Sequence, residues 1–453
     1  MDEQSYDKTS VDSIHEFAKQ LTGKSLGEVV YIPTALINDR NRGDLGSLVE
    51  SFYFQHRPAT NHGPDFPEAG LELKTTGVVK KSDGSYRAKE RLVLTMINFE
   101  SIVGEIWEGS SLLGKCRSML ILFYLYRKKL PVVDRIFVLD PLLYSLPNED
   151  LEIIKSDWEF IKKKVESGKA HELSEGDTFY LGACRKGSGG EGEALRKQPF
   201  SDEGAKARAF SFKPSYMNKL IGERASSAKS LGVGQNLSFQ EATAIRFDPF
   251  VGRSIEEISV LLDHHKKSPN HKGFHRELAL RILAHGKDLP PELAKAGIEM
   301  KTVRIQQNGR PREAMSFPGF KFLDIVNEEW EKSSFFERLE RKFLFVVFQT
   351  GPDGIERLLK VAYWNMPYED RLEAMRVWEE TKRRVALDAT DLPKSSESLV
   401  AHVRPKGRNG NDKIATPQGG MHLRQCFWLN AGYLEQVIGG TGKQIVGNNS
   451  SIT

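Results

Sequence analysis

Cysteine and long apolar runs are what this sequence most obviously lacks. Only three cysteines occur among 453 residues, at Cys116, Cys184 and Cys426, so no disulfide framework is expected. No Cys-x-x-Cys pair or Cys/His cluster predicts a zinc site. No apolar run approaches the roughly 18 residues of a membrane helix, and Met1–Lys19 lacks the basic and then apolar order of a signal peptide. We therefore expect a cytoplasmic protein that does not associate with membranes.

A strong excess of charge of one sign is also absent. The chain has 65 Lys and Arg against 61 Asp and Glu, which leaves a formal net charge of +4. This mildly basic balance is compatible with nucleic-acid binding but does not require it, because basic side chains can gather on one face. At 453 residues the chain is too long for one ordinary core, so two domains are expected.

Four segments of the sequence recur later in the same order. PEAGLELKT at 67–75 is echoed by AKAGIEMKT at 294–302, and FESIVGEIW at 99–107 by FLDIVNEEW at 322–330, each of the latter pair followed by an acid-x-Ser-Ser turn. PNEDLEIIKSDWE from Pro147 matches PYEDRLEAMRVWE from Pro367, and RAFSFKPSYMNKLIG from Arg208 matches QCFWLNAGYLEQVIG from Gln425. Four ordered echoes predict two homologous domains, at 1–225 and 245–440. The small and polar residues of 226–244 indicate a linker, and 441–453 is expected to be a disordered tail.

Each copy mixes strand and helix patterns. Leu71–Val79, Arg91–Met96 and Met119–Tyr124 are short apolar or alternating runs, which indicate strands. Asp150–Val165 carries one apolar stripe and predicts a helix, and Leu45–Phe52 shows helical spacing as well. The expected fold class is α/β (mixed α+β), with a central mixed sheet flanked by helices in each of two tandem domains.

The run Asp65-Phe-Pro-Glu-Ala-Gly-Leu-Glu72-Leu-Lys74 has side chains suited to chemistry. On a strand, Glu72 and Lys74 point to one face, while the leucines beside them point to the core. Asp65 can fold back beside Glu72 across the Pro/Gly bend, and two neighbouring carboxylates favour a divalent cation. Ligation by oxygen alone favours Mg²⁺ over zinc, and Lys74 would orient or help deprotonate an attacking water. The same Glu-x-Lys spacing is also typical of a solvated strand face with a weak surface ion pair.

The stretch PDFPEAGLELKT from Pro64 resembles the active-site signature of the PD-(D/E)xK nucleases, in the branch of the mismatch-repair nuclease MutH and the Sau-3A type restriction endonucleases. The likeness extends to LTGKSLGEV from Leu21, RGDLGSLVE from Arg42, GKAHELSEGDTFYLGACRKG from Gly168 and LRKQPFSDEGAKARAFSFKPSYM from Leu195. It covers essentially the whole chain, including a second MutH-like domain that follows the catalytic one. The resemblance implies two restriction-endonuclease folds and a site-specific deoxyribonuclease, most like the Sau-3A type II restriction endonucleases.

Residue by residue, the resemblance gives Asp65, Glu72 and Lys74 the catalytic positions. Glu50 matches the helix acid that supports the metal site, although it lies one residue further from Asp65 than the family pattern leads us to expect. The implied cofactor is Mg²⁺, with Mn²⁺ as a substitute, and its ligands would be Asp65, Glu72 and Leu73. The implied substrate is double-stranded DNA at GATC, cut before the guanine to leave 5′-phosphates.

Several basic residues lie on segments that resemble the DNA-contacting parts of the family. They are Arg42, Lys115, Arg185, Lys186, Lys206, Arg208 and Lys213. The glycine-rich stretch GSGGEGE at 187–193 would become ordered only on DNA. Each of these basic residues could instead be a solvated surface charge, and the sequence does not separate base contacts from phosphate contacts.

The second copy keeps part of the signature. Glu299 and Lys301 stand where Glu72 and Lys74 stand in the first copy, and Glu292 takes the place of Asp65. A longer side chain at the place of Asp65 would displace a metal ligand by about one methylene, which matters to a positioned reaction. Glu292, Glu299 and Lys301 are therefore expected to form a degenerate second site.

The resemblance implies that the second domain is a regulatory DNA-binding module. Its DNA loop would include Arg404 and Lys406, and a GATC bound there would act as an allosteric effector of the first domain. Cleavage of both strands of a palindrome implies a transient homodimer on DNA. A cognate DNA methyltransferase in the host would protect its own sites.

Two other functions stay open at this stage. One is a strand-nicking endonuclease of mismatch repair, which linear products from a supercoiled plasmid would exclude. The other is a non-catalytic DNA-binding regulator, which the complete set of Asp65, Glu72 and Lys74 disfavours.

Overall fold

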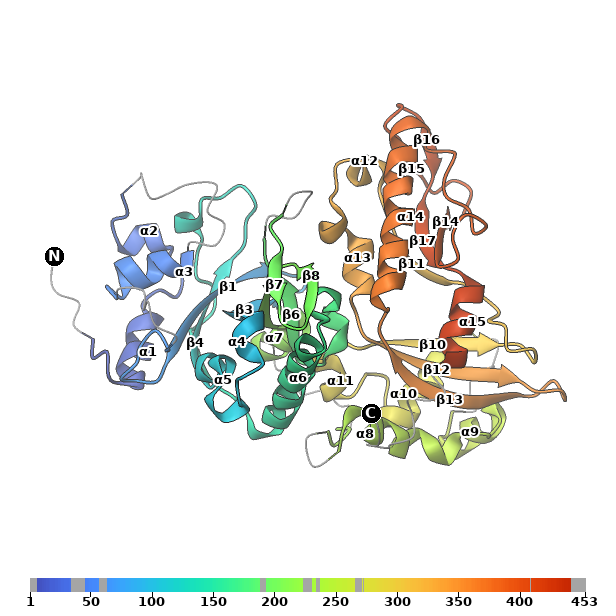
Figure 1. The fold of residues 1–453 in the computed structure, drawn as a ribbon, viewed down its shortest axis with the longest axis horizontal. Helices are drawn as coiled ribbons and strands as arrows, with labels where there is room; N and C mark the ends of the chain where they lie inside the picture. The colour runs from blue at the N-terminus through green and yellow to red at the C-terminus, as the bar shows by residue number, and fades with distance from the viewer. Residues whose placement is uncertain are drawn as a thin grey trace. The chain divides into compact units, whose positions relative to one another are not determined.

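The chain forms two compact units. The computed structural model describes residues 6–33, 45–56, 63–187, 193–222, 230–233, 237–264, 271, 273–407 and 409–440. Unit 1 holds Met1–His171, Tyr180–Lys186 and Arg196–Arg224, and unit 2 holds Glu172–Phe179, Gly187–Leu195 and Ala225–Thr453 (Figure 1). Arg42, most of the glycine-rich stretch and the 441–453 segment lie outside the described residues. Within the described part of the chain, no helix is both long enough and apolar enough to cross a membrane.

The main sheet of unit 1 has the strand order β2-β1-β4-β5. Its strands are β1 (Glu72–Lys80), β2 (Tyr86–Ala88), β4 (Ser118–Leu125) and β5 (Leu142–Ser145). β1 runs parallel to β4, and the two outer pairs are antiparallel. Met119–Tyr124 is buried on both faces, as is typical of a strand with a parallel neighbour inside a sheet. Alternate residues of this strand pack in one core with α1 (Val11–Lys19), α2 (Leu26–Val29) and α3 (Leu45–Leu48).

A second, antiparallel sheet of unit 1 has the order β3-β9-β6. Its strands are β3 (Leu92–Met96), β6 (Leu181–Arg185) and β9 (Arg208–Phe212), and β7 (Arg196–Gln198) pairs with β8 (Ser201–Ala205). The remaining helices are α4 (Phe99–Ile102), α5 (Ser111–Cys116), α6 (Asn148–Glu166) and α7 (Pro214–Ile221). The strands predicted at 71–79, 91–96 and 119–124 and the helix predicted at 150–165 are therefore confirmed.

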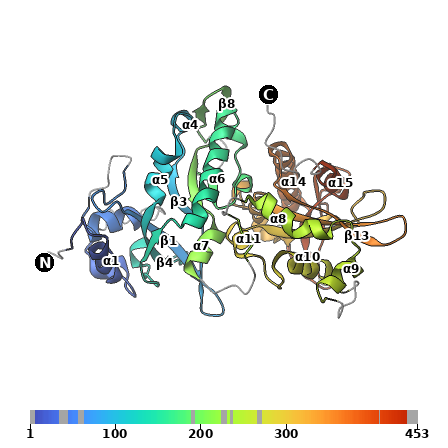
Figure 2. The same cartoon turned by 90° about the horizontal axis from the view of Figure 1, so that it is seen from below.

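Unit 2 contains the sheets β10-β12-β13, β11-β17-β14 and β15-β16. The strands are β10 (Glu299–Ile305), β11 (Met315–Gly319), β12 (Phe343–Thr350), β13 (Glu356–Trp364), β14 (Ala401–Pro405), β15 (Lys413–Ala415), β16 (Met421–Leu423) and β17 (Gln425–Leu429). The helices are α8 (Phe239–Phe247), α9 (Ile255–Leu261), α10 (Phe274–Ala284), α11 (Pro291–Lys295), α12 (Phe322–Ile325), α13 (Ser334–Leu339), α14 (Tyr368–Leu387) and α15 (Ala431–Gly440). Figure 2 shows α8 and α9 on the near side of the β13 sheet, with α14 and α15 behind it.

The two units repeat one topology. The parallel pair β1 and β4 corresponds to β10 and β12, and the order β3-β9-β6 corresponds to β11-β17-β14. One side-chain hydrogen bond recurs as well: Tyr216 Oη donates to Asp150 Oδ2 at 2.8 Å, and Tyr433 Oη donates to Asp370 Oδ2 at 2.7 Å. Each bond ties the last helix of its unit to the long helix that begins directly after Pro147 or Pro367. The expected tandem α/β fold is confirmed.

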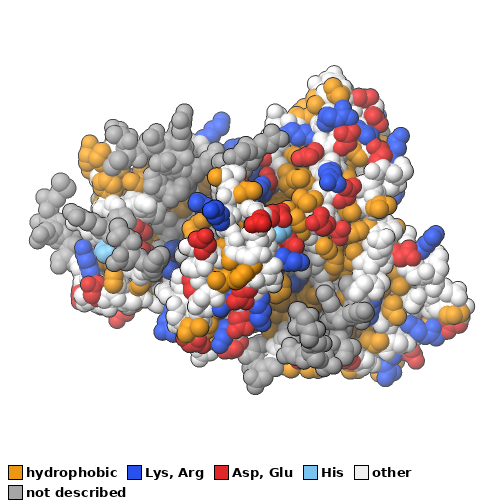
Figure 3. Space-filling view, in the orientation of Figure 1, with side chains coloured by type: hydrophobic (Ala, Val, Ile, Leu, Met, Phe, Trp, Pro, Cys, Tyr) orange, Lys and Arg blue, Asp and Glu red, His pale blue; other side chains and the backbone are white. Residues whose placement is uncertain are grey.

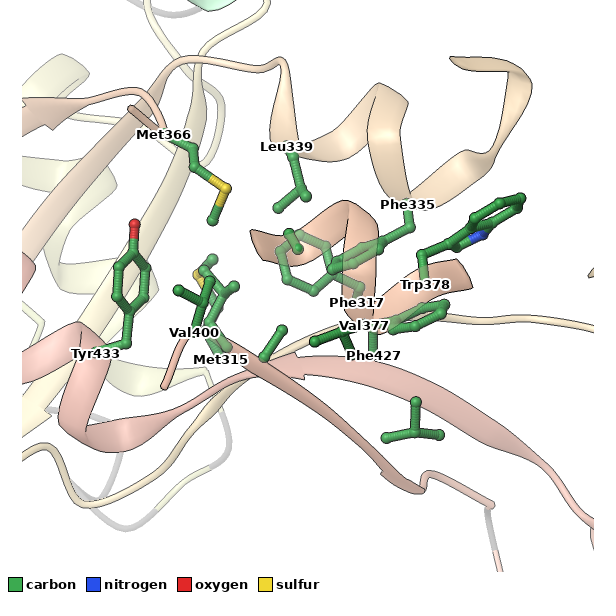
Figure 4. Packing of buried hydrophobic residues seen from close by; sticks show 14 of the residues in the cluster. Met315, Phe317, Phe335, Leu339, Met366, Val377, Trp378, Val400, Phe427 and Tyr433 are labelled. Atoms are coloured by element: carbon green, nitrogen blue, oxygen red, sulfur yellow. The ribbon is translucent and has the colours of Figure 1, made fainter. Parts of the chain in front are cut away.

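The core of unit 2 lies between α14 and the two sheets. Phe335 stacks on Phe427 with ring centroids 4.2 Å apart, and Trp378 of α14 packs in the same cluster (Figure 4). The cluster also includes Phe343, which begins β12. Because α13 and β12 are both anchored in this core, the turn between them is held beside the start of β10.

Candidate active site

A tight hairpin positions Asp65 beside the start of β1. Phe66 and Leu71 exchange two main-chain hydrogen bonds of 2.9 and 3.1 Å, and Gly70 closes the turn with a φ of +62°, a value that favours glycine. The chain therefore returns on itself, and Asp65 Oδ2 accepts a 2.8 Å hydrogen bond from the amide of Leu73. The Pro/Gly bend thus places the carboxylate of Asp65 one residue along the strand from Glu72.

Glu72 is the buried centre of the cluster, with a side chain only 2% exposed. Lys74 Nζ lies 2.5 Å from its Oε1 atom, and Lys115 Nζ lies 2.8 Å from its Oε2 atom. Lys115 comes from the last turn of α5, and its Nζ is also 4.0 Å from Asp65 Oδ1. A single ammonium group therefore reaches both carboxylates. Such charge-assisted contacts are stronger than neutral hydrogen bonds.

Glu50 approaches the same cluster from a π-helical turn at Val49–Tyr53, directly after α3. Such turns contain one more residue than an α-helical turn and are frequent at functional sites. This extra residue equals the one-residue difference between the Glu50–Asp65 separation in this chain and the separation in the family pattern. Burial, followed by the negative charge of Asp65, raises the pKa of Glu50 to about 7. Glu72, Lys74 and Lys115 have smaller effects on this pKa, so all of these groups and Asp65 lie within electrostatic range of Glu50.

The donor set of this cluster suits a hard divalent cation. It offers carboxylate oxygens only, with no sulfur or imidazole, and Mg²⁺ prefers such ligands. Among the described residues, no group of three or more His, Cys, Asp or Glu side chains is gathered closely enough to hold a metal ion. Lys74 and Lys115 instead neutralise Glu72, and a cation held by Asp65 and Glu72 would have to displace Lys115.

Five of the expected DNA-contacting residues of unit 1 fall into two groups. Arg185 and Lys186 at the end of β6 and Lys206 directly after β8 are partly exposed. Arg208 is only 6% exposed and its Nη1 donates to the carbonyl oxygen of Ala183 at 2.8 Å, and Lys213 is 7% exposed. In this conformation the first group has surface to offer DNA, and the last two residues have almost none.

The second copy assembles only part of its expected site. Glu299 Oε1 lies 2.8 Å from Lys301 Nζ, which repeats the pairing of Glu72 with Lys74. Glu292 lies on α11, the helix that stands where the first copy has its hairpin. Its carboxylate accepts hydrogen bonds from the Ser230 hydroxyl and from the amides of Leu231 and Gly232. The structure thus brings Glu299 and Lys301 together and engages Glu292 elsewhere.

Arg338 and Arg341 are site residues that sequence reasoning missed. Arg338 Nη1 lies 3.0 Å and Arg341 Nη1 3.6 Å from Glu299 Oε2. The repeat held a signal for the first of them. Arg338 follows the Ser-Ser turn of its copy at the same interval as Lys115 in the first copy, and both residues contact Oε2 of the signature glutamate. Arg404 and Lys406 are exposed, and both cations lie over the ring of Trp428.

Comparison with known proteins places this geometry in a family. The family model described as DNA mismatch repair enzyme MutH matches residues 54–157 and 283–376. The type II restriction enzyme Sau3AI of Staphylococcus aureus is 31% identical over 487 aligned residues, which cover 94% of this chain and 98% of that relative. The chain belongs to the MutH and Sau3AI family of endonucleases. DNA mismatch repair proteins MutH of Serratia proteamaculans and Vibrio vulnificus are 28% and 29% identical, over 36% and 35% of this chain and 69% and 68% of their own lengths.

Membership of the MutH and Sau3AI family confirms the enzyme class expected from the sequence, a site-specific deoxyribonuclease of the type II restriction endonuclease kind. The family model matches one stretch in each unit, so both halves of the chain are MutH-like. Enzymes of this family act with divalent metal ions on DNA.

Proposed function

We propose that the chain hydrolyses double-stranded DNA at GATC with Mg²⁺ bound in unit 1. The observation that carries this proposal is the meeting of Asp65, Glu72 and Lys74 at the start of β1, in a chain that aligns with Sau3AI over almost its whole length. Water attacks the phosphorus, a new P–O bond forms, and the bond to the 3′ oxygen breaks. The products are a 5′-phosphate and a 3′-hydroxyl.

The carboxylates of Asp65 and Glu72 and the main-chain oxygen of Leu73 would hold the Mg²⁺ ion. When bound, the ion supplies positive charge that stabilises the scissile phosphate and favours hydroxide over water. Lys74 projects from the same strand face as Glu72 and is 19% exposed, so its amine can reach a water molecule that enters the site. Lys74 would orient that water and help to remove its proton, and Glu50 would support the carboxylates from the π-helical turn.

Digestion of a supercoiled plasmid with several GATC sites tests this proposal. The purified full chain with Mg²⁺ is expected to give linear fragments that begin with 5′-phosphorylated GATC. Lys74→Ala is expected to abolish cleavage, whereas Lys80→Ala, an exposed lysine on the same strand, is expected to cleave like the parent. Cleavage that survives in Lys74→Ala would refute the site, and fragment ends at another sequence would refute the specificity.

The mismatch-repair name of the matching family model favours a second candidate, a strand-nicking enzyme. A nickase would convert the same plasmid to open circles and leave no linear product. Binding to GATC duplexes without any cleavage would instead support a non-catalytic regulator. Linear product without accessory proteins separates restriction from both.

For the second half of the chain we propose regulation. Residues 245–440 would bind a second GATC through Arg404, Lys406 and the degenerate site, and this binding would raise activity in the domain of residues 1–225. A transient homodimer would supply the second catalytic domain needed to cut both strands, and a cognate methyltransferase would protect host DNA. A single-site plasmid cut with first-order dependence on protein would argue against the dimer.

A further inference from the structure

The carboxylate of Glu299 is surrounded by cations. Lys301 Nζ lies 2.8 Å from Oε1, and two arginines of α13 and the following turn, Arg338 and Arg341, lie 3.0 and 3.6 Å from Oε2. Burial opposes ionisation of Glu299, but the contacts with Lys301 and Arg338 outweigh burial and lower its pKa. Glu299 is thus an anion held by an excess of positive charge.

A further arginine contacts the main-chain oxygen that corresponds to a proposed metal ligand of the first copy. Arg276 Nη1 donates a 3.1 Å hydrogen bond to the carbonyl oxygen of Met300. Met300 follows Glu299 directly, as Leu73 follows Glu72. The main-chain oxygen that corresponds to the proposed metal ligand Leu73 is therefore capped by a guanidinium group.

The two clusters consequently differ in the sign of their charge. In unit 1, two lysines face three acids, Asp65, Glu72 and Glu50. In unit 2, four basic groups lie at or beside Glu299, namely Arg276, Lys301, Arg338 and Arg341, and they face two acids, Glu299 and the exposed Glu337, which pairs with Arg341 at 2.9 Å. An excess of carboxylates attracts a divalent cation, and an excess of guanidinium groups repels one and attracts an anion.

The cluster in unit 2 is also open to a ligand. The side chains of Lys301, Arg338 and Arg341 are 30%, 33% and 33% exposed, compared with 19% for Lys74 and 17% for Lys115 in unit 1. A guanidinium group carries five N–H donors in a planar fork, so one carboxylate leaves most of these donors for another partner. Phosphate oxygens match this fork in geometry and charge.

We propose that Arg276, Lys301, Arg338 and Arg341 bind a DNA phosphodiester in unit 2 without a divalent metal ion. This inference rests on the proposed function, in which unit 2 binds DNA, and it names the site and the chemistry of that binding. Arginine takes over the role that the metal ion has in unit 1, so the second site holds DNA and does not cut it.

The test is the affinity of the full chain for a fluorescent GATC duplex in EDTA, measured across a salt series. Arg338→Gln/Arg341→Gln is expected to weaken binding about tenfold and to flatten the slope of log K against log salt by about one, the value for roughly one lost phosphate contact. Arg338→Lys/Arg341→Lys keeps the charge and is expected to restore the slope but only part of the affinity, because lysine lacks the planar fork.

The control is Arg376→Gln/Arg383→Gln, which removes the same charge from α14. These arginines are 73% and 61% exposed and pair with Glu373 and Glu380. Figure 3 shows acidic and basic side chains intermixed over this part of the surface, so a specific phosphate site is not expected there. Equal losses in the two Gln pairs would overturn the inference, because the effect would then be general electrostatics. Unchanged affinity in Arg338→Gln/Arg341→Gln would overturn it too.

Failure of the inference and failure of the proposed function give different results. If the parent cleaves GATC DNA with Mg²⁺ but does not bind the duplex in EDTA, only the metal-independent site is wrong. If the parent neither cleaves nor binds, the proposed function is wrong as well. Titration of the full-length Asp65→Asn/Glu72→Gln variant with Mn²⁺ is expected to show no tight site. A Mn²⁺ site that persists there and disappears on Glu299→Gln would overturn the inference directly.

Discussion

Burial and the charge of Asp65 strongly perturb the carboxyl group of Glu50 in the candidate active site. Its pKa in the folded, metal-free protein is about 7, against an ordinary value of 4.5, because it is buried and faces Asp65. Between these two pH values the folded protein keeps a proton that the unfolded chain releases. The stability that this proton provides is therefore complete below pH 4.5 and is lost as the pH rises through 7.

Glu50→Gln is accordingly expected to stabilise unit 1 at high pH and not at low pH. The amide has no charge to desolvate, so the melting temperature of the metal-free variant should exceed that of the parent by about 2 °C at pH 8 and match it at pH 5. Scanning calorimetry in EDTA measures the difference, with the exposed Glu100→Gln as a control. A stabilisation that is the same at both pH values would contradict the assigned acidity.

Lys115 competes with a metal ion for two carboxylates. Its Nζ atom lies 2.8 Å from Glu72 Oε2 and 4.0 Å from Asp65 Oδ1, so a cation must displace it. Lys115→Met is expected to bind Mn²⁺ about tenfold more tightly, since a charged hydrogen bond contributes about 1.5 kcal/mol or more. The same variant is expected to cleave more slowly, because it lacks a positive charge near the phosphate. Calorimetry with Mn²⁺ and a cleavage time course measure the two effects, and weaker metal binding than in Lys80→Met would contradict the competition.

At the scale of elements, the 66–71 hairpin sets the position of Asp65. Gly70 has a φ of +62°, and a Cβ atom there would meet nothing within 4 Å, so alanine would be strained by its backbone alone. Gly70→Ala is expected to destabilise unit 1 by about 1 kcal/mol and to reduce cleavage several-fold. Gly109→Ala is the matched control, because Gly109 also has open space but no positive φ. Equal activity of the two variants would show that the hairpin does not position Asp65.

Sequence alone predicted those elements whose pattern is local. Alternation in Leu71–Val79 gave the strand and placed Glu72 and Lys74 on one face, and the Pro/Gly bend explained the return of Asp65. The position and hydrogen-bond partners of Glu292 could not be predicted from such a local pattern. Pro291 at the first turn of α11 favours a helix over a hairpin, and the carboxylate then meets main-chain amides at 231–232.

Residues that depend on tertiary packing escaped prediction. Arg208 lies on β9, the central strand of its sheet, so its guanidinium group bonds Ala183 and is buried. Arg338 and Arg341 reach Glu299 only because α13 and the turn after it are packed beside the start of β10. No periodicity in the sequence of α13 or of β10 predicts these contacts with Glu299. Only the position of Arg338 relative to the repeated Ser-Ser turn indicated it.

At the scale of the whole molecule, two units share one topology and differ in charge at the corresponding site. If unit 2 is a DNA-binding regulator, a short GATC duplex added in trans is expected to speed the cutting of a single-site plasmid by about fivefold or more. A duplex of scrambled sequence is the control, and quantitative gel analysis of early time points gives the rates. Simple inhibition by the GATC duplex would show competition for one site and contradict regulation.

The guanidinium groups around Glu299 also bear on how the two halves could evolve. Removing any one of Arg276, Arg338 and Arg341 still leaves more basic than acidic groups in the cluster, and it places no carboxylate where unit 1 has Asp65. If unit 2 binds DNA without cutting it, as proposed, a cutting centre would require several substitutions together, so no single mutation would create one. Under the proposed function, the DNA sequence that unit 2 recognises could then change during evolution without producing a second cleavage site in the same enzyme.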